Sequence, residues 1–285
     1  MKYLDHDTIV RIANSLPPLP QVVLQITEII SNPDYLVRDI VNAVQLDPVV
    51  TGQLLRMANS PLYGGGHVST VHEAVVRLGA GTVRSIAISR SARPTANLDL
   101  SAFGETPLSY WRHSVAAFSF AEELASRRIA RFGHDFATAA LLHDFGKLVL
   151  ARHLTPDHAE AIRLLSKEIP EVAAEMQILS MNHAEVTAVV LQAWGLPDSL
   201  VRIVQHHHNP ADYEHPACFG LTLANHLAWQ LQDRSAALEL ESHERQASID
   251  ALGLTDAQME AVLESGTQRF HSAMDVFGAD LKVTA

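Results

Sequence analysis

The sequence has a single cysteine, no long apolar run and fewer positive than negative charges. Cys218 cannot form an intramolecular disulfide, and one lone thiol fits the reducing cytoplasm in which we expect the protein. No apolar run reaches the roughly 18 residues that span a bilayer, and none follows Met1, so we expect neither a membrane contact nor a signal peptide. The net charge of −11 argues against nucleic acid as a partner, because binding to phosphate backbones requires a basic surface.

The sequence also lacks the two-residue alternation of half-buried strands, and it has no internal repeat. Its 285 residues, 47% of them hydrophobic, provide enough apolar material for one large or two moderate globular domains. Apolar residues recur at the three- and four-residue spacing of amphipathic helices, and we therefore predict an all-α fold. We expect helices over residues 21–30, 36–44, 48–58, 71–78, 81–88, 109–128, 135–153, 170–179, 184–194, 197–206 and 216–231.

Capping and turn residues indicate where several of these helices begin or end. Asp47 stands before Pro48, as an N-cap stands before a proline in the first helical turn. Ser69 or Thr70 is placed to cap the following helix, and Gly79 is expected to end it. Nothing in this first part of the chain indicates catalysis, so we interpret it as a helical bundle that presents a surface.

Residues 91–107 contain prolines, a glycine and small polar residues without a helical period, so we predict a linker there. Beyond residue 236 the sequence again predicts helices, with a capping box that begins at Thr255 and a helix end at Gly266. We therefore expect three units, which are an N-terminal helical subdomain over 1–95, a second helical subdomain over 96–235 and a C-terminal helical extension over 236–285.

The stretch from Leu141 to Leu150 places charged residues in an apolar environment. His143, Asp144 and Lys147 lie within five positions of one another, in what the pattern predicts to be one buried helix. Burying an unpaired charge costs several kcal/mol. These three side chains therefore need partners elsewhere in the fold.

Histidine is the residue type that can supply such partners. The chain has 16 histidines, and several stand on or at the ends of separate predicted helices, among them His113, His183 and the run His206–His208. Imidazole and carboxylate together suit Zn, Mn, Fe, Ni or Mg, and a helical bundle can bring such ligands to one interior point. The residue types alone leave two interpretations open, a metal site or histidines that are structural or solvated without a metal.

Several different short motifs occur before, within and after the stretch from Leu141 to Leu150. Leu142–Lys147 is similar to the core motif of the HD superfamily of metal-dependent phosphohydrolases. Further motifs occur in order within residues 12–230, and they are Leu46–Pro48, Leu54–Ser60, Ala74–Gly79, Asn182–Val186, Trp194–Pro197 and His207–Pro210. Together they resemble the HDOD domain, a signalling branch of that superfamily. The resemblance implies an HD-superfamily helical bundle preceded by an N-terminal helical subdomain.

The resemblance also implies which residues bind metal. The matching positions are His113, His143, Asp144, His183, His207 and His208. Lys147 matches the lysine that lies beside the substrate phosphate in catalytic relatives.

Two positions depart from the pattern of the catalytic relatives. The last metal ligand of the superfamily, an aspartate, is matched by Asn225, whose amide is a poorer ligand. The HD-GYP phosphodiesterases have a glutamate four residues before the first histidine, where this chain has Ser109. Asp144 and the three later histidines would still form a four-ligand site, whereas His113 and His143 would be left with a weakened one.

These departures favour regulation over catalysis. We expect a signal-transduction module that holds divalent metal (Fe, Mn, Zn, Ni or Mg) in a degenerate HD pocket and binds a signalling protein partner, with a nucleotide or cyclic dinucleotide as a candidate ligand. The alternative is a metal-dependent phosphohydrolase acting on a nucleotide or cyclic dinucleotide, in which Asp144 and Lys147 would be catalytic. A third interpretation is a structural core of His–Asp hydrogen bonds without metal.

Overall fold

The computed structural model describes residues 6–64 and 67–277, and every regular element within these ranges is a helix. None of the helices in the described ranges is long and apolar enough to cross a membrane. The prediction of an all-α fold is therefore confirmed.

The N-terminal part consists of α1 (His6–Ser15), α2 (Gln21–Ser31), α3 (Val37–Gln45), α4 (Pro48–Ala58), the 3-10 helix η1 (Pro61–Tyr63) and α5 (Val71–Ile88). As predicted, the side chain of Asp47 caps α4 by accepting hydrogen bonds from two backbone amides of its first turn. Thr70, rather than Ser69, caps α5. Gly79 interrupts α5 with a φ of 77°, so the predicted helix end is present as a kink after which the chain continues as a second helical segment.

The central part contains η2 (Ser101–Phe103), α6 (Pro107–Ser126), α7 (Phe136–Leu142), α8 (Phe145–Ala151), α9 (Pro156–Leu165), α10 (Glu171–Leu179), α11 (His183–Ala193), α12 (Asp198–Gln205), η3 (Pro210–Asp212) and α13 (Pro216–Leu231). The helix α9 was not among the predicted helices. Its start has a readable signal, because Thr155 accepts a hydrogen bond from the amide of His158 and Pro156 occupies the first turn.

The prediction of one continuous helix over 135–153 is wrong, because the chain breaks between α7 and α8. The break lies at His143 and Asp144, and Asp144 has φ −96° and ψ 8°. Beyond it, the amide of Gly146 donates to the hydroxyl of Thr187 on α11, at 2.7 Å. In a straight helix, adjacent side chains point about 100° apart. The break allows His143 and Asp144 to face the same interior point.

The C-terminal part consists of α14 (Ser235–Leu240), α15 (Ser242–Leu252) and α16 (Asp256–Phe277). The predicted capping box is present, because the amides of Thr255 and Gln258 each donate to the other residue's side chain, at 2.9 and 3.3 Å. The prediction that Gly266 ends a helix is wrong, because it lies inside α16. A Cβ at this position would overlap the ring of Phe120 on α6, so the glycine allows two helices to approach closely.

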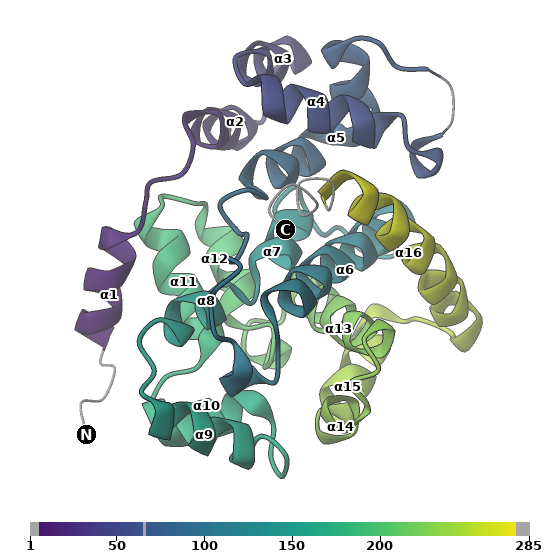
Figure 1. Ribbon diagram of the computed structural model, residues 1–285. Coiled ribbons are helices and arrows are strands. Elements are labelled where there is room, and N and C mark those ends of the chain that lie inside the picture. Colours follow the sequence, from purple (N-terminus) through teal and green to yellow (C-terminus); the bar gives the residue numbers. More distant parts are fainter. Residues whose placement is uncertain (1–5, 65–66, 278–285) are drawn as a thin grey trace.

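Segments that are distant in the sequence lie side by side (Figure 1). Helices α2 to α5 form a group at the top of the view, whereas α1 lies apart from them at the left edge and packs against α11. Helix α16 packs along α6 and also contacts α4, and α13 packs on the other flank of α6. The division into three units remains a prediction, and the helices of each predicted unit contact those of another.

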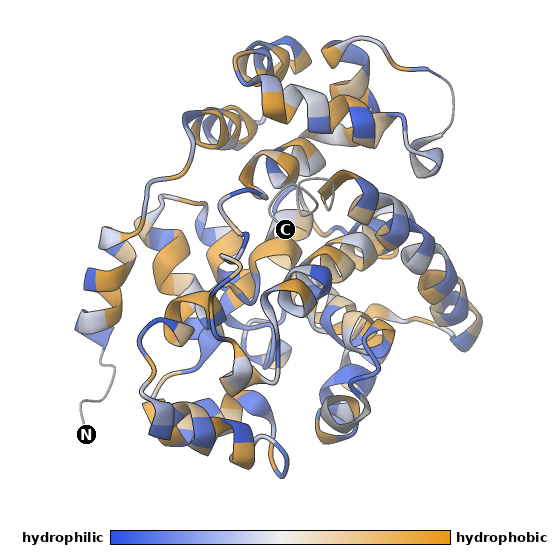
Figure 2. Ribbon diagram, in the orientation of Figure 1, coloured by the Kyte–Doolittle hydropathy of each residue, from blue (hydrophilic) through white to orange (hydrophobic). Residues whose placement is uncertain are grey.

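The hydropathy pattern marks the interior of the molecule (Figure 2). The central helix α7 is apolar along its length, whereas outer helices such as α16 alternate between polar and apolar stretches. Every residue of α7 is buried, as are nearly all residues of α8 and most residues of α13. The ends of these buried helices carry the polar side chains described next.

Candidate metal centre

The fold brings all six sequence-predicted ligands together in its interior. His113 comes from α6, His143 and Asp144 from the α7–α8 break, and His183 from the first residue of α11. His207 and His208 follow the end of α12, and all six side chains are buried.

A first group of donor atoms lies around Asp144 and consists of one atom each from Asp144, His183, His207 and His208, all within 4.8 Å of one another. The Nε2 atom of His183 lies 3.1 Å from Oδ1 of Asp144 and 3.1 Å from Nε2 of His208. The Nε2 atom of His207 lies 3.9 Å from the same carboxylate oxygen. This is the four-ligand set implied by the resemblance.

A second group shares Asp144 with the first and adds His113 and His143. Their Nε2 atoms lie 3.2 Å apart. The Nε2 atom of His143 is 3.4 Å from Oδ1 of Asp144, and that of His113 is 3.7 Å from Oδ2. The carboxylate therefore lies between the two groups, in position to face both.

Hydrogen bonds at Nδ1 fix the orientation of four of the imidazoles. The Nδ1–H groups of His143 and His207 donate to the carbonyls of Ala140 and Val204, at 2.8 and 2.6 Å. Because a carbonyl oxygen can only accept, the Nε2 atom of each neutral ring carries a lone pair. These lone pairs face the interior of the site.

Carboxylates bind the Nδ1 atoms of the other two rings, those of His183 and His208. The Nδ1 atom of His183 lies 2.8 Å from Glu175, whose carboxylate also accepts the backbone amide of His183 at 2.7 Å. The Nδ1 atom of His208 lies 3.3 Å from Oε2 of Glu241. Such outer hydrogen bonds are a regular feature of metal-bound histidines, because they fix the tautomer and the ring orientation.

The donor set fits a divalent metal ion. Two nitrogens that share an ion at about 2.0–2.1 Å are roughly 2.8–3.4 Å apart, with octahedral angles at the lower end of this range and tetrahedral angles at the upper end. The two Nε2–Nε2 separations of 3.1 and 3.2 Å fall in this range. In addition, Nε2 of His207 is buried and has no hydrogen-bond partner in the part of the chain that the structure describes. A donor set rich in imidazole suits Zn, Fe, Ni or Mn better than Mg.

The protonation states of most of these residues are those that a metal ion requires. Burial lowers the pKa values of His113, His207 and His208 well below the ordinary value of a histidine, so these rings are neutral. Burial would raise the pKa of Asp144, but the neighbouring His143 and Lys147 outweigh it and hold that pKa well below its usual range.

His183 is the exception among the ligands. Burial lowers its pKa, but the carboxylate of Glu175 outweighs burial and raises the pKa to about 10. In the metal-free protein this ring therefore carries two protons, and a metal ion at Nε2 would displace one of them.

Lys147 lies among carboxylates rather than open to a ligand. Its Nζ is 2.9 Å from Oδ2 of Asp144, 2.6 Å from Oε1 of Glu171 and 4.0 Å from Oε1 of Glu105. Burial would lower the pKa of Lys147, but these carboxylates outweigh it and raise the pKa, so the side chain stays charged. Arg234 completes the network at 2.8 Å from Glu105 and 3.4 Å from Glu171.

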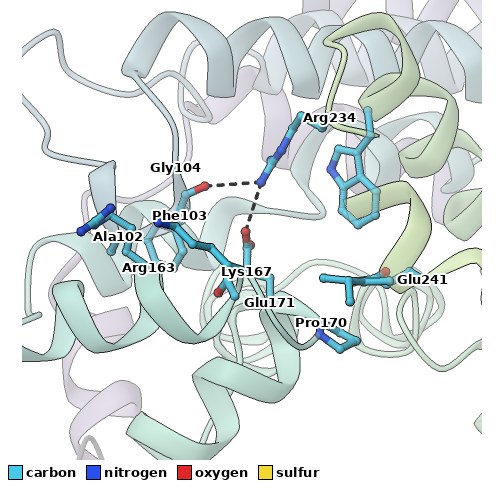
Figure 3. Close-up of a pocket in the computed structure, with 12 residues that line it drawn as sticks. Ala102, Phe103, Gly104, Arg163, Lys167, Pro170, Glu171, Arg234 and Glu241 are labelled. Carbon is cyan, nitrogen blue, oxygen red and sulfur yellow. Dashed lines mark hydrogen bonds and ion pairs between the residues drawn. The ribbon is translucent and has the colours of Figure 1, made fainter. Parts of the chain in front are cut away.

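A cavity of about 310 Å³ adjoins this network. Figure 3 shows Arg234 and Glu171, which both line the cavity, pointing toward one another, with dashed lines from Arg234 to the backbone of η2 and to Glu171. Lys167 on the α9–α10 side and Glu241 near α15 also line the cavity. Because Glu241 contacts His208 and Glu171 contacts Lys147, the cavity lies directly beside the histidine cluster.

The two departures from the catalytic pattern have different structural positions. Asn225 is buried on α13, and its Oδ1 has no hydrogen-bond partner within the described ranges. Ser109 lies in the first turn of α6, where its hydroxyl accepts a hydrogen bond from the backbone amide of Thr106 at 2.8 Å. Ser109 is therefore a capping residue.

Sequence reasoning missed the charged residues around the cluster, namely Glu105, Glu171, Glu175, Arg234 and Glu241. Their burial is set by tertiary packing, and none belongs to a motif quoted above. The sequence contains one indirect signal of these residues. A lysine and several histidines that are predicted to be buried require neighbouring carboxylates.

Comparison with known proteins adds a family assignment. A family model described as HDOD domain matches residues 16–210. An uncharacterised protein of Treponema pallidum is 26% identical over 216 residues, which are 70% of this chain and 40% of that protein. This chain therefore spans less than half the length of that relative.

Solved structures show the same fold. A proposed signal transduction protein from Marinobacter aquaeolei is 28% identical with a TM-score of 0.69, and the match covers 98% of this chain and 61% of that one. An HDOD domain protein of unknown function from Geobacter sulfurreducens is 20% identical with a TM-score of 0.70, covering 95% and 99% of the two chains. A proposed phosphohydrolase from Shewanella amazonensis is 22% identical with a TM-score of 0.66, covering 95% and 97%.

Proposed function

The chain belongs to the HDOD domain family, and from that premise we propose that it is a regulatory module of signal transduction that holds a divalent metal ion in a degenerate HD pocket. The observation that carries the metal proposal is the convergence of Nε2 lone pairs from neutral rings whose Nδ1 atoms are already bonded, as at His207 and His208. The 28%-identical Marinobacter protein, itself a proposed signal transduction protein, supports the regulatory part.

We assign one ion to the four-ligand group of Asp144, His183, His207 and His208. Three imidazoles and one carboxylate provide the four ligands of a transition metal ion, and only the carboxylate is charged. The bound ion would connect the ends of α8, α11 and α12. The ion would supply positive charge and a Lewis-acidic position beside the cavity. The residues of the chain supply ligand orientation through Glu175 and Glu241.

The phosphohydrolase alternative has weaker support. A two-metal hydrolase needs both ions to neutralise and position the phosphate. The second position has His113 and His143 but shares its only carboxylate, Asp144, with the first, and Asn225 stands where the superfamily has an aspartate. In addition, Lys147 is already paired with carboxylates. We therefore propose that the chain acts by binding a signalling protein or a small ligand, and not by turnover.

Elemental analysis of the untagged protein tests the metal site. We expect close to one transition metal ion per chain in the wild type, and none in the His183→Ala/His207→Ala double variant. The matched control is His206→Ala. His206 lies outside both ligand groups, and its ring stacks on that of Tyr213 with the two ring centroids 5.7 Å apart. Absence of metal from the wild type would refute the metal proposal.

An activity screen tests the regulatory assignment. Nucleotides, cyclic dinucleotides and model phosphodiesters are incubated with the protein and with Mn, Fe, Ni or Mg. We expect no metal-dependent turnover above the double variant. Two ions per chain together with turnover that is lost in His143→Ala would favour the phosphohydrolase instead.

A further inference from the structure

Arg84 is a buried arginine that joins the N-terminal helices to the helices around the candidate metal centre. It lies on α5, and its side chain is only 1% exposed. Its guanidinium donates to the hydroxyl of Thr138 at 3.2 Å, to the carbonyl of His134 at 3.0 Å and to the carboxylate of Asp135 at 2.7 Å. These partners lie in the first turn of α7 or directly before it. Breaking a buried ion pair leaves an uncompensated charge, so Arg84 holds the start of α7 firmly to α5.

The same contacts reach α12. The second carboxylate oxygen of Asp135 accepts a hydrogen bond from the hydroxyl of Ser199, which lies in the first turn of α12. The hydroxyl of Ser85, the neighbour of Arg84, lies 3.0 Å from that of Thr138. One cluster of polar side chains on α5 therefore holds the starts of both α7 and α12.

Three of the four proposed metal ligands follow the other ends of these two helices. Asp144 comes two residues after the end of α7, and His207 and His208 come two and three residues after the end of α12. Helices of 7 and 8 residues are roughly 10 and 12 Å long and move as rigid elements. A shift at their starts is therefore transmitted to the ligands at their ends.

Helix α5 is the element that can impose such a shift. It packs against α2, α3 and α4 and also against α7 (Figure 1). A Cβ at Gly81 would lie 2.7 Å from the carbonyl oxygen of His134, so α5 lies directly on the loop before α7. A cavity of about 460 Å³ is lined by the kink at Gly79 and by Phe136 at the start of α7. The junction is therefore not fully packed, and α5 has room to move relative to α7.

We propose that Arg84 is a positioning residue of the metal centre, which sets the ligand positions through the starts of α7 and α12 and couples them to the N-terminal helices. A signalling protein that binds the N-terminal helices would thereby change the affinity for metal, and metal would change the affinity for that protein by the same factor. The inference rests on the proposed function, because it requires an ion at the four-ligand group. It names how that site is regulated.

The metal affinity of the folded protein tests the proposal. The wild type, Arg84→Met and Arg127→Met are titrated with Co²⁺ against a chromophoric chelator, at a temperature at which all three are folded. Arg127→Met is the matched control, because the ion pair and hydrogen bonds of Arg127 join α6 to α16. We expect Arg84→Met to bind Co²⁺ about 5-fold or more weakly than the wild type, and Arg127→Met to remain within about 2-fold.

The visible absorption of bound Co²⁺ separates positioning from a purely structural role, because its bands depend on the arrangement of the ligands. A structural arginine would lower the free energy of unfolding when removed, but the protein that remains folded would keep its affinity and its spectrum. We expect the spectrum of Arg84→Met to differ from that of the wild type and that of Arg127→Met to match it. Unchanged affinity and spectrum in folded Arg84→Met would overturn the proposal.

Three milder substitutions test the contacts separately, and they decide the matter if Arg84→Met does not fold. Thr138→Val removes the hydroxyl on α7 and Ser199→Ala the hydroxyl on α12, and each should weaken Co²⁺ binding about 3-fold or more. Arg84→Lys keeps a charge beside Asp135 and should bind Co²⁺ more tightly than Arg84→Met. Wild-type affinity in both Thr138→Val and Ser199→Ala would overturn the proposal.

The wild type separates this inference from the proposed function. If the wild type binds no Co²⁺, the proposed metal site is wrong and the inference falls with it. If the wild type and all the variants at Arg84, Thr138 and Ser199 bind Co²⁺ equally well, the inference alone is wrong and the metal site stands.

Discussion

Glu175 determines how His183 presents its Nε2 atom. The buried carboxylate accepts both Nδ1–H and the backbone amide of His183, at 2.8 and 2.7 Å. The substitution Glu175→Gln keeps the volume and an acceptor oxygen but removes the negative charge that makes the imidazole more basic. We expect metal affinity to fall about 10- to 100-fold, as measured by competition with a chromophoric chelator.

The matched control for this substitution is Glu168→Gln, which changes an exposed glutamate of the same region. It should leave the affinity unchanged. Equal affinities for Glu175→Gln and the wild type, at equal metal content, would show that the carboxylate does not tune the ligand.

Cys218 is expected to be inert in the folded protein. The thiol is buried on α13, and burial raises its pKa to about 12, so almost no thiolate is present at neutral pH. A disulfide reagent such as Ellman's should therefore label the chain at the rate of global unfolding. Rapid stoichiometric labelling under native conditions would show that α13 opens locally.

The ligands of the site could be named from the sequence, whereas the residues that orient them could not. His143, Asp144 and His183 belong to short motifs, and such motifs can be recognised from a few consecutive residues of the sequence. Glu241 lies 33 residues from the ring of His208 that it contacts. Such a pairing depends on where α15 packs, and no local pattern of residues records it.

At the scale of elements, Gly146 controls the distance between α8 and α11. A Cβ at this position would overlap the carbonyl oxygen of His183 and crowd the hydroxyl of Thr187. The substitution Gly146→Ala should therefore push α8 away from α11, lower the free energy of unfolding by about 3 kcal/mol and weaken metal binding. Chemical denaturation and metal analysis of the purified variant measure both effects.

Gly52→Ala is the control for Gly146→Ala, because Gly52 lies in α4 and nothing lies within 4 Å of a Cβ placed there. Alanine is favoured over glycine in a helix, so this variant should be more stable by about 0.5–1 kcal/mol. A similar stability change in both variants would contradict the close approach of α8 and α11.

The sequence predicted helix N-termini where the capping residues lie close to the helix start in the sequence. The caps at Asp47 and Thr255 use side chains within three residues of the amides that they accept, so the sequence contains all the participants. The break at His143–Asp144 and the continuation of α16 through Gly266 have tertiary causes. The first involves Thr187 on α11 and the second the ring of Phe120, which are distant in the sequence.

At the scale of the whole molecule, the candidate site joins segments from most of the chain. Its ligands come from α6, the α7–α8 break, α11 and the end of α12, and the flanking Arg234 and Glu241 lie beyond the residues matched by the family model. A metal ion at Asp144 would therefore link helices that are distant in the sequence and would add to the contacts that already hold them, such as the hydrogen bond from Gly146 to Thr187 between α8 and α11. Its effect on stability should extend to the entire fold.

Metal removal is the prediction that follows at this scale. A ligand bound only by the native state stabilises it by an amount that grows with the logarithm of the ratio of the free ligand concentration to the dissociation constant, so a chelator such as dipicolinate should lower the Tm of the wild type by roughly 5 °C or more. Readdition of the metal should restore the Tm. The His183→Ala/His207→Ala variant should not respond to either treatment. If the wild type is equally unresponsive in calorimetry, the cluster is a hydrogen-bonded core, and its buried imidazoles stabilise the fold without an ion.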